Sequence, residues 1–313
     1  MENNKVYNDT PGRVTEQHHG IFKIATDGAE YNAAVSGRLS REAGSAGLPV
    51  VGDNVTLRIE GGSAVITGIM ERRSLISRKA AGNTEERQPI AANVDIVFVC
   101  MALDDNYNLR RLERYIAAVS SENVQIAVLL TKADLCPDAA DKRARILSAY
   151  PDTRVILCSS ADGRGYDEAA ALIGPNMTAV FTGSSGVGKS TLINFVTGAW
   201  MRTGEVRTED GRGRHTTTHR QLITLPNGGA VIDTPGMREL AIYTGDVDSA
   251  FPEIEALTGS CRFADCAHKN EPGCAILSAV ERGDIDRQRY ESYMKLNAEL
   301  KHRQMRREQY RHR

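Results

Sequence analysis

The stretch that most constrains the fold is GSSGVGKST at residues 183–191. It follows the apolar segment TAVFT, which is typical of a buried strand, and precedes LINFV, which is typical of a helix. A strand, a glycine-rich turn and a helix N-terminus in this order form a phosphate-binding loop, in which backbone N–H groups converge on phosphate oxygens. The sequence therefore predicts a nucleoside triphosphate site rather than a chance glycine-rich turn. Within the loop, Lys189 is expected to reach the β- and γ-phosphates as a catalytic residue, and Ser190 to ligate Mg²⁺. The loop residues expected to bind the nucleotide are Gly183, Ser184, Ser185, Gly186, Val187, Gly188, Lys189, Ser190 and Thr191.

The composition indicates a globular chain of two or three domains. With 313 residues, of which 41% are hydrophobic, the chain can bury a sizeable core. The net charge is −1, so any basic surface for a nucleic acid must be local. No apolar run is long enough for a membrane span and the N-terminus lacks an apolar signal core, so we expect a cytoplasmic protein with no membrane partner. Its six cysteines are then expected to be thiols or metal ligands rather than disulfides.

Residues 1–75 are expected to form a small β-barrel. Short β-like segments alternate with glycines, and Gly61-Gly62 suits a tight hairpin between two of them. Several short strands without a long helical period favour an OB-type barrel. Such a barrel either binds oligonucleotides through one face or is purely structural, and the sequence leaves both open. The polar segment 76–90 is expected to be a linker. The candidate barrel strands are 20–24, 33–36, 55–59 and 64–67.

Residues 91–245 have the pattern of an α/β domain. Buried-strand patterns at 94–100, 124–130 and 154–158 alternate with helical patterns before the phosphate loop is reached. Such alternation indicates a mostly parallel sheet covered on both faces, with ligands at the carboxyl ends of its strands. The segments TKAD and SSA follow the second and third of these strands. We therefore expect them to lie beside the phosphate loop in space.

TKAD, residues 131–134, resembles the guanine-recognition motif Asn-Lys-x-Asp of GTPases. Asp134 can accept hydrogen bonds from N1–H and the N2 amino group of guanine, whereas adenine presents no such donor pair, so the nucleotide is expected to be GTP. Lys132 is expected to lie along the base plane. Thr131, where Asn is usual, is expected to weaken the contacts on the N7/O6 side. SSA is expected to offer a backbone N–H to guanine O6. The residues expected around the base are Thr131, Lys132, Ala133, Asp134, Ser159, Ser160 and Ala161.

The order of these motifs is rotated along the chain. In an ordinary GTPase the phosphate loop precedes the guanine motif, but here Asp134 precedes Lys189. Because neighbours in a sheet are fixed in space, joining the old termini and cutting the chain elsewhere preserves the site. The central domain is therefore expected to be a circularly permuted P-loop GTPase.

Further Mg²⁺ and phosphate contacts are expected from residues after the phosphate loop. Asp233, at the end of a strand, is expected to hold Mg²⁺ through water, and the Gly236 N–H to contact the γ-phosphate. In the stretch GRGRHTTTH, a threonine hydroxyl is expected to complete the Mg²⁺ shell in the GTP state and to leave it after hydrolysis. Thr217 is the favoured residue, with Thr216 and Thr218 as alternatives.

The residue that orients the attacking water is a separate question. Met237 follows DTPG at the position where many GTPases keep a glutamine, and a methionine cannot orient water. His215 is the hypothesis for this catalytic role. The alternative is that His215 is a solvated loop histidine.

A Cys/His cluster lies in the C-terminal part, residues 246–313. Cys261, Cys266, His268 and Cys274 offer three thiolates and one imidazole within a short stretch. Cys₃His is a closed tetrahedral ligand set for structural zinc, so one Zn²⁺ ion is expected. The other three cysteines are expected only to pack in the core. The tail is helical in character and ends in a basic run, for which an RNA-phosphate contact and a solvated helix end both remain open.

Together these elements closely resemble the small-ribosomal-subunit-dependent GTPases of bacterial ribosome biogenesis, the RsgA/YjeQ family. The resemblance covers almost the whole chain, from VGDNV in the barrel through the permuted GTPase motifs to the Cys/His cluster. It implies a multidomain chain with an OB-type barrel, a permuted GTPase domain and a zinc-binding α-helical domain. It further implies binding to the maturing small subunit and its rRNA, faster GTP hydrolysis there and release with GDP. We expect the protein to be a monomer.

Two other functions remain open from the sequence. The first is a nucleotide-gated RNA-binding switch whose hydrolysis is incidental, and GTP turnover with added subunits separates it from a stimulated hydrolase. The second is an ATP-dependent P-loop enzyme, against which Asp134 argues.

Overall fold

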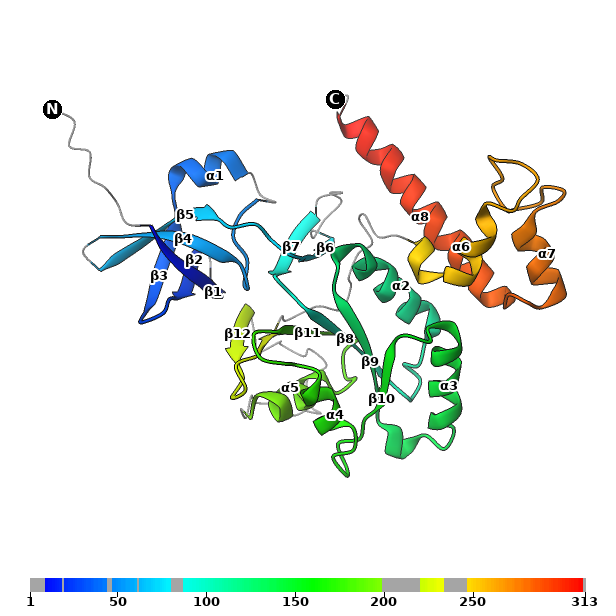
Figure 1. Cartoon of the computed structure of the whole chain (residues 1–313), viewed down its shortest axis with the longest axis horizontal. Coiled ribbons are helices and arrows are strands. Elements are labelled where there is room, and N and C mark those ends of the chain that lie inside the picture. The colour runs from blue at the N-terminus through cyan, green and yellow to red at the C-terminus, as the bar shows by residue number, and fades with distance from the viewer. Residues whose placement is uncertain are drawn as a thin grey trace, which may run out of the picture.

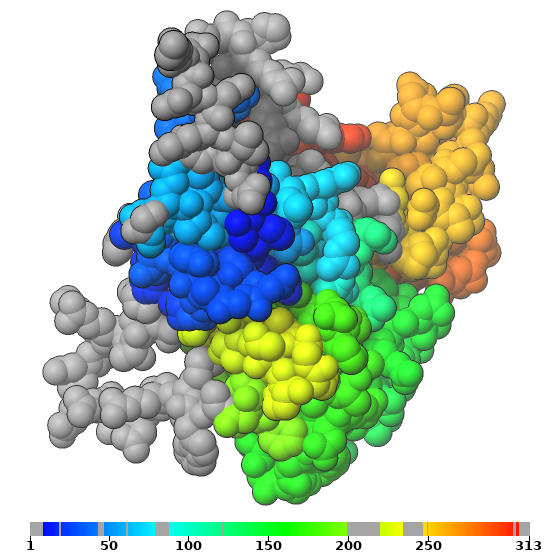
Figure 2. All heavy atoms as spheres, turned by 60° about the vertical axis from the view of Figure 1, so that its left-hand side comes forward, coloured from blue at the N-terminus to red at the C-terminus, as the bar shows by residue number. Residues whose placement is uncertain are grey.

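The computed structural model describes residues 9–18, 20–43, 47–60, 62–79, 87–198, 220–233 and 247–311. They form a β-barrel, a central α/β domain and a group of C-terminal helices, which follow one another across Figure 1. The barrel and the central domain share one sheet, because β1 (Thr10–His18) pairs antiparallel with β12 (Arg220–Thr224). Figure 2 shows the barrel lying directly against the surface of the β12 region. None of the described helices is long and apolar enough to cross a bilayer.

The barrel closes through its first five strands. The strands are β1, β2 (Ile21–Ala25), β3 (Glu30–Val35), β4 (Asn54–Glu60) and β5 (Ser63–Ile69), and helix α1 (Gly37–Ala43) connects β3 to β4. β1 pairs with both β2 and β4, β2 with β3, β3 in parallel with β5, and β5 with β4. This ring leaves no open edge, as in an OB-type barrel. The four candidate strands and the hairpin at Gly62 are confirmed.

β1 is a strand that the sequence pattern did not predict. Its segment, TPGRVTEQH, is polar, and Val14 is its one fully buried residue. The strand is held by backbone pairing with three neighbours, β2, β4 and β12. Hydrogen bonds to neighbouring strands, two of them distant in sequence, therefore determine its conformation rather than an alternating apolar pattern.

Part of the segment expected as a linker forms a second, two-stranded sheet. β6 (Leu75–Lys79) and β7 (Arg87–Ala92) pair antiparallel. Ile76 and Ile90 bury their side chains at 2% exposure, although charged and polar residues surround them in the sequence. Because the composition of this segment is polar, the sequence predicted a linker here rather than a strand pair that is half buried against the rest of the protein.

The segment VGDNV forms a buried junction beside β7. Asp53 is fully buried, and its carboxylate accepts hydrogen bonds from Arg72 Nε at 2.7 Å and Arg72 Nη2 at 2.8 Å. Gly52 has φ +93°, and a Cβ there would lie 2.2 Å from the Ala92 carbonyl oxygen. Only glycine fits this approach, so the segment fixes the barrel against β7.

The central sheet has the strand order β10-β9-β8-β11-β13-β12. Its strands run parallel except β12, which is antiparallel to β13. β11, which precedes the phosphate loop, therefore lies in the middle of the sheet. The bounds are β8 (Ile96–Ala102), β9 (Gln125–Thr131), β10 (Arg154–Leu157), β11 (Thr178–Thr182) and β13 (Ala230–Asp233).

Helices cover both faces of this sheet, as the continuous apolar strands predict. Along β8, Val97 and Val99 pack in one core with Leu112 and Ile116 of α2, whereas Phe98 packs in another core with residues of α4 and α5. The helices and helical turns are α2 (Leu109–Val119), η1 (Ser120–Glu122), η2 (Ala133–Leu135), α3 (Ala139–Ala149), α4 (Tyr166–Ala171) and α5 (Lys189–Thr197).

The C-terminal elements are η3 (Asp248–Ala250), α6 (Pro252–Thr258), α7 (Ala275–Arg282) and the long α8 (Arg287–Arg311). Two of them, the helical turn η3 and the last helix α8, pack against α2. Arg289 of α8 contacts the buried carboxylate of Glu113 on α2 at 3.2 Å and donates to Glu253 on α6 and to Tyr150 after α3. This charge cluster, in which only Glu253 is substantially exposed, holds the C-terminal helices on the central domain. The expected fold class, a barrel followed by a permuted α/β domain and a helical part with a Cys/His cluster, is confirmed.

Candidate functional site

The phosphate loop lies between β11 and α5, at the carboxyl edge of the sheet. Gly183 has φ +142° and Gly188 has φ +90°, which L side chains rarely adopt, and a Cβ on Gly183 would lie 2.2 Å from the Cys100 carbonyl oxygen. The Lys189 ammonium donates to two carbonyls of its own loop, at 2.8 and 2.7 Å. The loop is therefore preformed, and its ammonium lies across the turn where a loop of this kind receives phosphates.

An acidic group accompanies the loop at the end of the adjacent parallel strand. Asp233 ends β13, which pairs with β11. Burial raises the pKa of Asp233, and the nearby charge of Lys189 opposes that rise. A divalent cation at this carboxyl would favour its ionised form, as expected of an Mg²⁺ partner. The other residues predicted for this side, His215, Thr216, Thr217, Thr218 and Gly236, lie outside the described residues.

The guanine motif begins where β9 ends and continues into η2. Lys132 has a left-handed backbone with φ 58°. Asp134 is exposed and makes no hydrogen bond or ion pair with any residue in the described ranges, so its carboxylate is available to a ligand. The Ala133 N–H donates to the Cys158 carbonyl at 3.0 Å and so connects this motif to the loop after β10.

Thr131 contacts the phosphate loop directly. Its hydroxyl donates to the Val187 carbonyl oxygen at 2.7 Å, and Thr131 is only 5% exposed. From the sequence, Thr131 was expected only to weaken the contacts to the base. The structure gives it a further role, because this buried hydrogen bond holds the guanine motif and the phosphate loop together.

The loop after β10 is held in one conformation by its own hydrogen bonds. Ser159 is fully buried, and its hydroxyl accepts from the Ala161 N–H at 3.2 Å. Of the three N–H groups of SSA, that of Ser160 makes no hydrogen bond to a described residue, so it is available to a ligand. Hydrogen bonds from the backbone and side chain of Arg164, and one with Ser159, lower the pKa of Asp162 to about 2. The loop therefore presents its backbone in a fixed arrangement.

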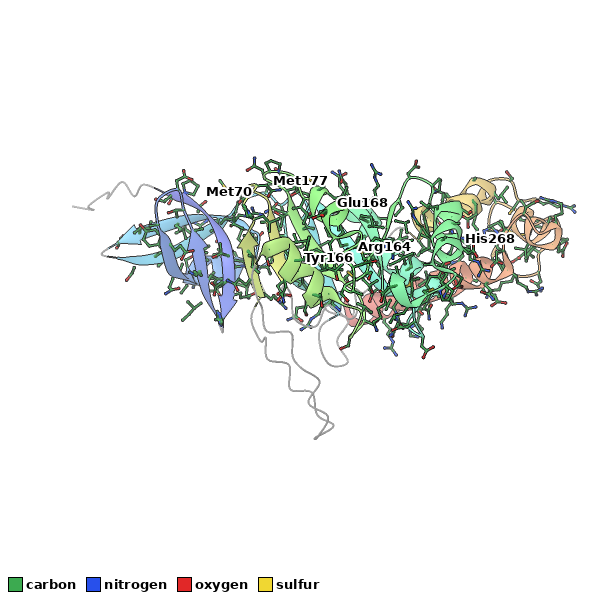
Figure 3. All side chains as sticks on the ribbon, turned by 90° about the horizontal axis from the view of Figure 1, so that it is seen from below. Met70, Arg164, Tyr166, Glu168, Met177 and His268 are labelled. Carbon is green, nitrogen blue, oxygen red and sulfur yellow. The ribbon has the colours of Figure 1, made fainter. Side chains whose placement is uncertain are left out.

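A ring contact connects this loop to the phosphate-loop helix. Tyr166, the first residue of α4, packs edge-on against Phe195 of α5, with ring centroids 5.0 Å apart and planes at 70°. Figure 3 labels Arg164 and Tyr166 on the central domain, and His268 lies apart from them, on the side of the C-terminal helices. The nucleotide site and the Cys/His cluster are therefore separate centres.

Two charged residues that no sequence motif indicated also lie beside this site. Asp104, two residues after β8 ends, lies 2.6 Å from the Lys132 ammonium. Arg111, in the first turn of α2, donates to the Ser184 hydroxyl of the phosphate loop at 3.2 Å. The available signal was the position of Asp104, an acidic residue close to the carboxyl end of a buried parallel strand.

The four side chains of the Cys/His cluster have the geometry of a tetrahedral metal centre. Their ligand atoms lie within 4.8 Å of one another. Zinc bonds of about 2.3 Å to sulfur and about 2.0–2.1 Å to nitrogen place two sulfurs about 3.8 Å apart and a sulfur about 3.6 Å from a nitrogen. The Cys261 and Cys274 sulfurs are 3.9 Å apart, and each is 3.6 Å from His268 Nδ1. These residues therefore fit one zinc ion; the fourth is Cys266.

The surrounding residues support the cluster. The Tyr290 hydroxyl of α8 donates to the His268 carbonyl at 2.7 Å, and the Glu271 carboxylate accepts from the N–H groups of Lys269 at 2.8 Å and Asn270 at 3.1 Å. Cys274 caps α7 by accepting from a backbone N–H in its first turn. Tyr290 and Glu271, which are not ligands themselves, therefore help to hold the loop in the arrangement that a metal ion needs.

Comparison with known proteins identifies relatives along almost the whole chain. Residues 69–243 match the model of the RsgA GTPase family. A protein of Lactiplantibacillus plantarum named small ribosomal subunit biogenesis GTPase RsgA 2 is 44% identical over 292 residues, which are 92% of this chain and 83% of that protein. A protein of Methanosarcina acetivorans named small ribosomal subunit biogenesis GTPase RsgA is 42% identical over 296 residues, covering 92% of this chain and 79% of that protein.

Solved structures show the same arrangement of strands and helices. YjeQ from Thermotoga maritima matches with a TM-score of 0.70 at 26% identity, over 94% of this chain and 99% of that one. YloQ, described as a circularly permuted GTPase, matches with a TM-score of 0.67 at 25% identity, over 97% of this chain and 99% of that one. These matches agree with the strand order, in which the phosphate-loop strand follows the guanine-motif strand in sequence but lies beside β8 in the sheet.

Proposed function

Because this chain belongs to the RsgA GTPase family, we propose that it hydrolyses GTP to GDP and phosphate in the biogenesis of the small ribosomal subunit. The observation that carries the proposal is the joining of two motifs far apart in sequence. A buried hydrogen bond from Thr131 to Val187 connects the free carboxylate of Asp134 and its motif to a preformed phosphate loop. A guanine-selective carboxylate and a phosphate loop in one site are the minimum requirement for a GTPase.

The roles of the site residues follow from their positions. Backbone N–H groups of the phosphate loop bind the phosphates, and Lys189 turns its ammonium from the loop carbonyls to the β- and γ-phosphates. Asp134 accepts from guanine, and the free Ser160 N–H donates to O6. Ser190 and Asp233 hold the Mg²⁺ that accompanies GTP and supplies charge neutralisation at the phosphates.

Residues beyond the described ranges complete the proposed mechanism. Thr217 is proposed as a further Mg²⁺ ligand and His215 as the residue that orients the attacking water. Gly236 is proposed to contact the γ-phosphate through its N–H. Replacement of His215 by alanine should abolish stimulated turnover while GTP binding is retained, and unchanged turnover would assign the role to another group.

The partner is proposed to be the maturing small ribosomal subunit. The small ribosomal subunit is part of the names of the relatives. The barrel and the zinc-binding helices offer two separate surfaces, one on either side of the GTPase domain. We propose that both surfaces contact rRNA, and that Cys261, Cys266, His268 and Cys274 hold a zinc ion. We further propose that the protein is a cytoplasmic monomer and that it leaves the subunit with GDP bound.

GTP turnover with and without purified small subunits tests this proposal. Turnover should rise strongly with small subunits but not with large subunits. Asp134→Ala and Lys189→Ala should lose the stimulated rate, whereas Asp141→Ala, which removes an exposed carboxylate from α3, should keep it. Flat turnover with intact GTP binding would refute the hydrolase function, and preference for ATP in competition would refute the guanine assignment.

A further inference from the structure

We propose that the β8–α2 segment, residues 103–111, is an additional element of the nucleotide site. In it Asp104 positions Lys132 of the guanine motif, and Arg111 positions Ser184 of the phosphate loop. The inference rests on the proposed function, since these contacts serve GTP only if the site binds GTP. Both are positioning residues that act through another side chain.

Asp104 fixes the tip of the Lys132 side chain. Its Oδ2 lies 2.6 Å from the Lys132 ammonium, and its Oδ1 accepts from the Asn106 N–H at 2.8 Å. The hydrogen bond from Lys132 and that from the Asn106 backbone lower the pKa of Asp104, so the carboxylate is ionised at neutral pH. At its other end, the side chain starts from a left-handed backbone, in which Lys132 has φ 58°. With both ends of the side chain determined, the aliphatic stem between them has a defined direction.

A fixed stem favours binding of the base. A lysine that lies against a purine face loses rotamer freedom on binding, and a lysine already held in one conformation loses less. The Lys132 and Asp104 side chains are 36% and 32% exposed. An ion pair this open contributes little to folding, so its effect is expected in nucleotide affinity rather than in stability.

Arg111 makes the corresponding contact on the phosphate side. Its Nη1 donates to the Ser184 hydroxyl at 3.2 Å and to the Asn106 carbonyl at 3.4 Å. The Ser184 carbonyl in turn accepts from the Lys189 ammonium at 2.7 Å. Asn108 caps α2 by accepting from the Arg111 N–H at 3.1 Å, which fixes the helix end that carries this arginine.

One short segment therefore contacts both halves of the site. Asn106 connects the two contacts, because its N–H bonds Asp104 and its carbonyl accepts from Arg111. The segment itself is held beside β9, since the Leu103 N–H donates to the Thr131 carbonyl at 2.9 Å. This arrangement sets the distance between the base-binding and phosphate-binding groups before the nucleotide arrives.

Asp104→Asn tests the base-side contact, with Asp105→Asn as matched control. Asp105 carries the same charge one residue away, is exposed and makes no hydrogen bond or ion pair in the described part of the chain. Dissociation constants are measured by titration with GTP and with ITP, whose base lacks the 2-amino group. We expect Asp104→Asn to weaken both nucleotides by a similar factor of about 3–5. The GTP/ITP ratio, which reports on Asp134, should stay constant, kcat should be unchanged, and Asp105→Asn should match the wild type.

A double-mutant cycle shows whether Asp104 acts through Lys132. In a Lys132→Met background, Asp104→Asn should have no further effect on GTP affinity. The inference is overturned if Asp104→Asn binds GTP like the wild type, if its effect persists in the Lys132→Met background, or if the GTP/ITP ratio changes. If the wild-type protein fails to bind GTP at all, the proposed function itself fails, which is a distinct result.

Arg111→Met tests the phosphate side in the same way. We expect about 3–10-fold weaker binding of GTP and GDP, and no further loss in a Ser184→Ala background. Arg110→Met is the matched control, because Arg110 lies one residue earlier and pairs instead with Glu291 of α8. Equal behaviour of Arg111→Met and Arg110→Met would overturn this half of the inference.

Discussion

The hydrogen bond from Thr131 to Val187 offers a direct test of how the two nucleotide motifs are joined. Thr131→Val keeps the shape of the side chain and removes only the hydroxyl that donates to the Val187 carbonyl at 2.7 Å. Because Thr131 is 5% exposed and Val187 fully buried, water cannot easily replace the lost donor. The variant therefore isolates one buried contact between the guanine motif and the phosphate loop.

The size of the effect follows from that burial. A neutral hydrogen bond contributes about 0.5–1.5 kcal/mol net, and a buried carbonyl left without a donor costs about 1–3 kcal/mol. We therefore expect Thr131→Val to lower the free energy of unfolding by about 1–2 kcal/mol. If the loop released by this substitution must be ordered again when phosphate binds, the free energy of GTP binding becomes less favourable by up to about 1.4 kcal/mol. This corresponds to a tenfold weaker affinity for GTP.

Urea denaturation and GTP titration measure the two effects separately. Thr131→Ser is the matched control, because it keeps the hydroxyl and loses only a methyl group, and it should bind GTP like the wild type. Thr131→Asn restores the residue usual in this motif and can donate through its amide. If Thr131→Val had wild-type stability and wild-type GTP affinity, the hydrogen bond would not be what joins the two motifs.

Two further predictions concern the C-terminal helices. Arg289→Met leaves the buried Glu113 carboxylate without its ion-pair partner and should lower the free energy of unfolding by about 3–5 kcal/mol at pH 7 in urea denaturation. Burial raises the pKa of Glu113 and Arg289 opposes that rise, so in the variant the folded state binds this proton more tightly than the unfolded state. The loss of unfolding free energy relative to the wild type should therefore become smaller as the pH falls toward about 5. An equal loss at both pH values would contradict this. Cys261→Ser should reduce bound zinc from about one ion per chain to almost none by elemental analysis. Cys136→Ser, outside the cluster, should keep the metal, and zinc retained in Cys261→Ser would exclude the proposed ligand set.

Features that depend on short-range patterns could be predicted from the amino-acid sequence. A glycine-rich turn between an apolar strand and a helix is typical of a phosphate loop, because the conformation of the turn depends on local backbone freedom. Continuous apolar runs of strand length alternating with helical periods likewise specified a parallel sheet with its ligands at the carboxyl edge. Four metal-ligating side chains within one short stretch indicated their centre by spacing alone. The fold class and the Cys/His geometry follow from these patterns, and the assignment of individual nucleotide-site residues remains a prediction.

Which distant segments meet could be read only from the folded chain. The polar strand β1 is fixed by partners as remote as β12, so its own residues carry almost no signal. Thr131 and Val187 are 56 positions apart, and Lys132 and Asp104 are 28 apart, yet each pair forms one contact at the sheet edge. Parallel strands bring their carboxyl ends together regardless of the chain length between them. Which side chains then touch depends on register and on loop conformation, which no local pattern encodes, and for that reason the contacts of the β8–α2 segment emerged only from the folded chain.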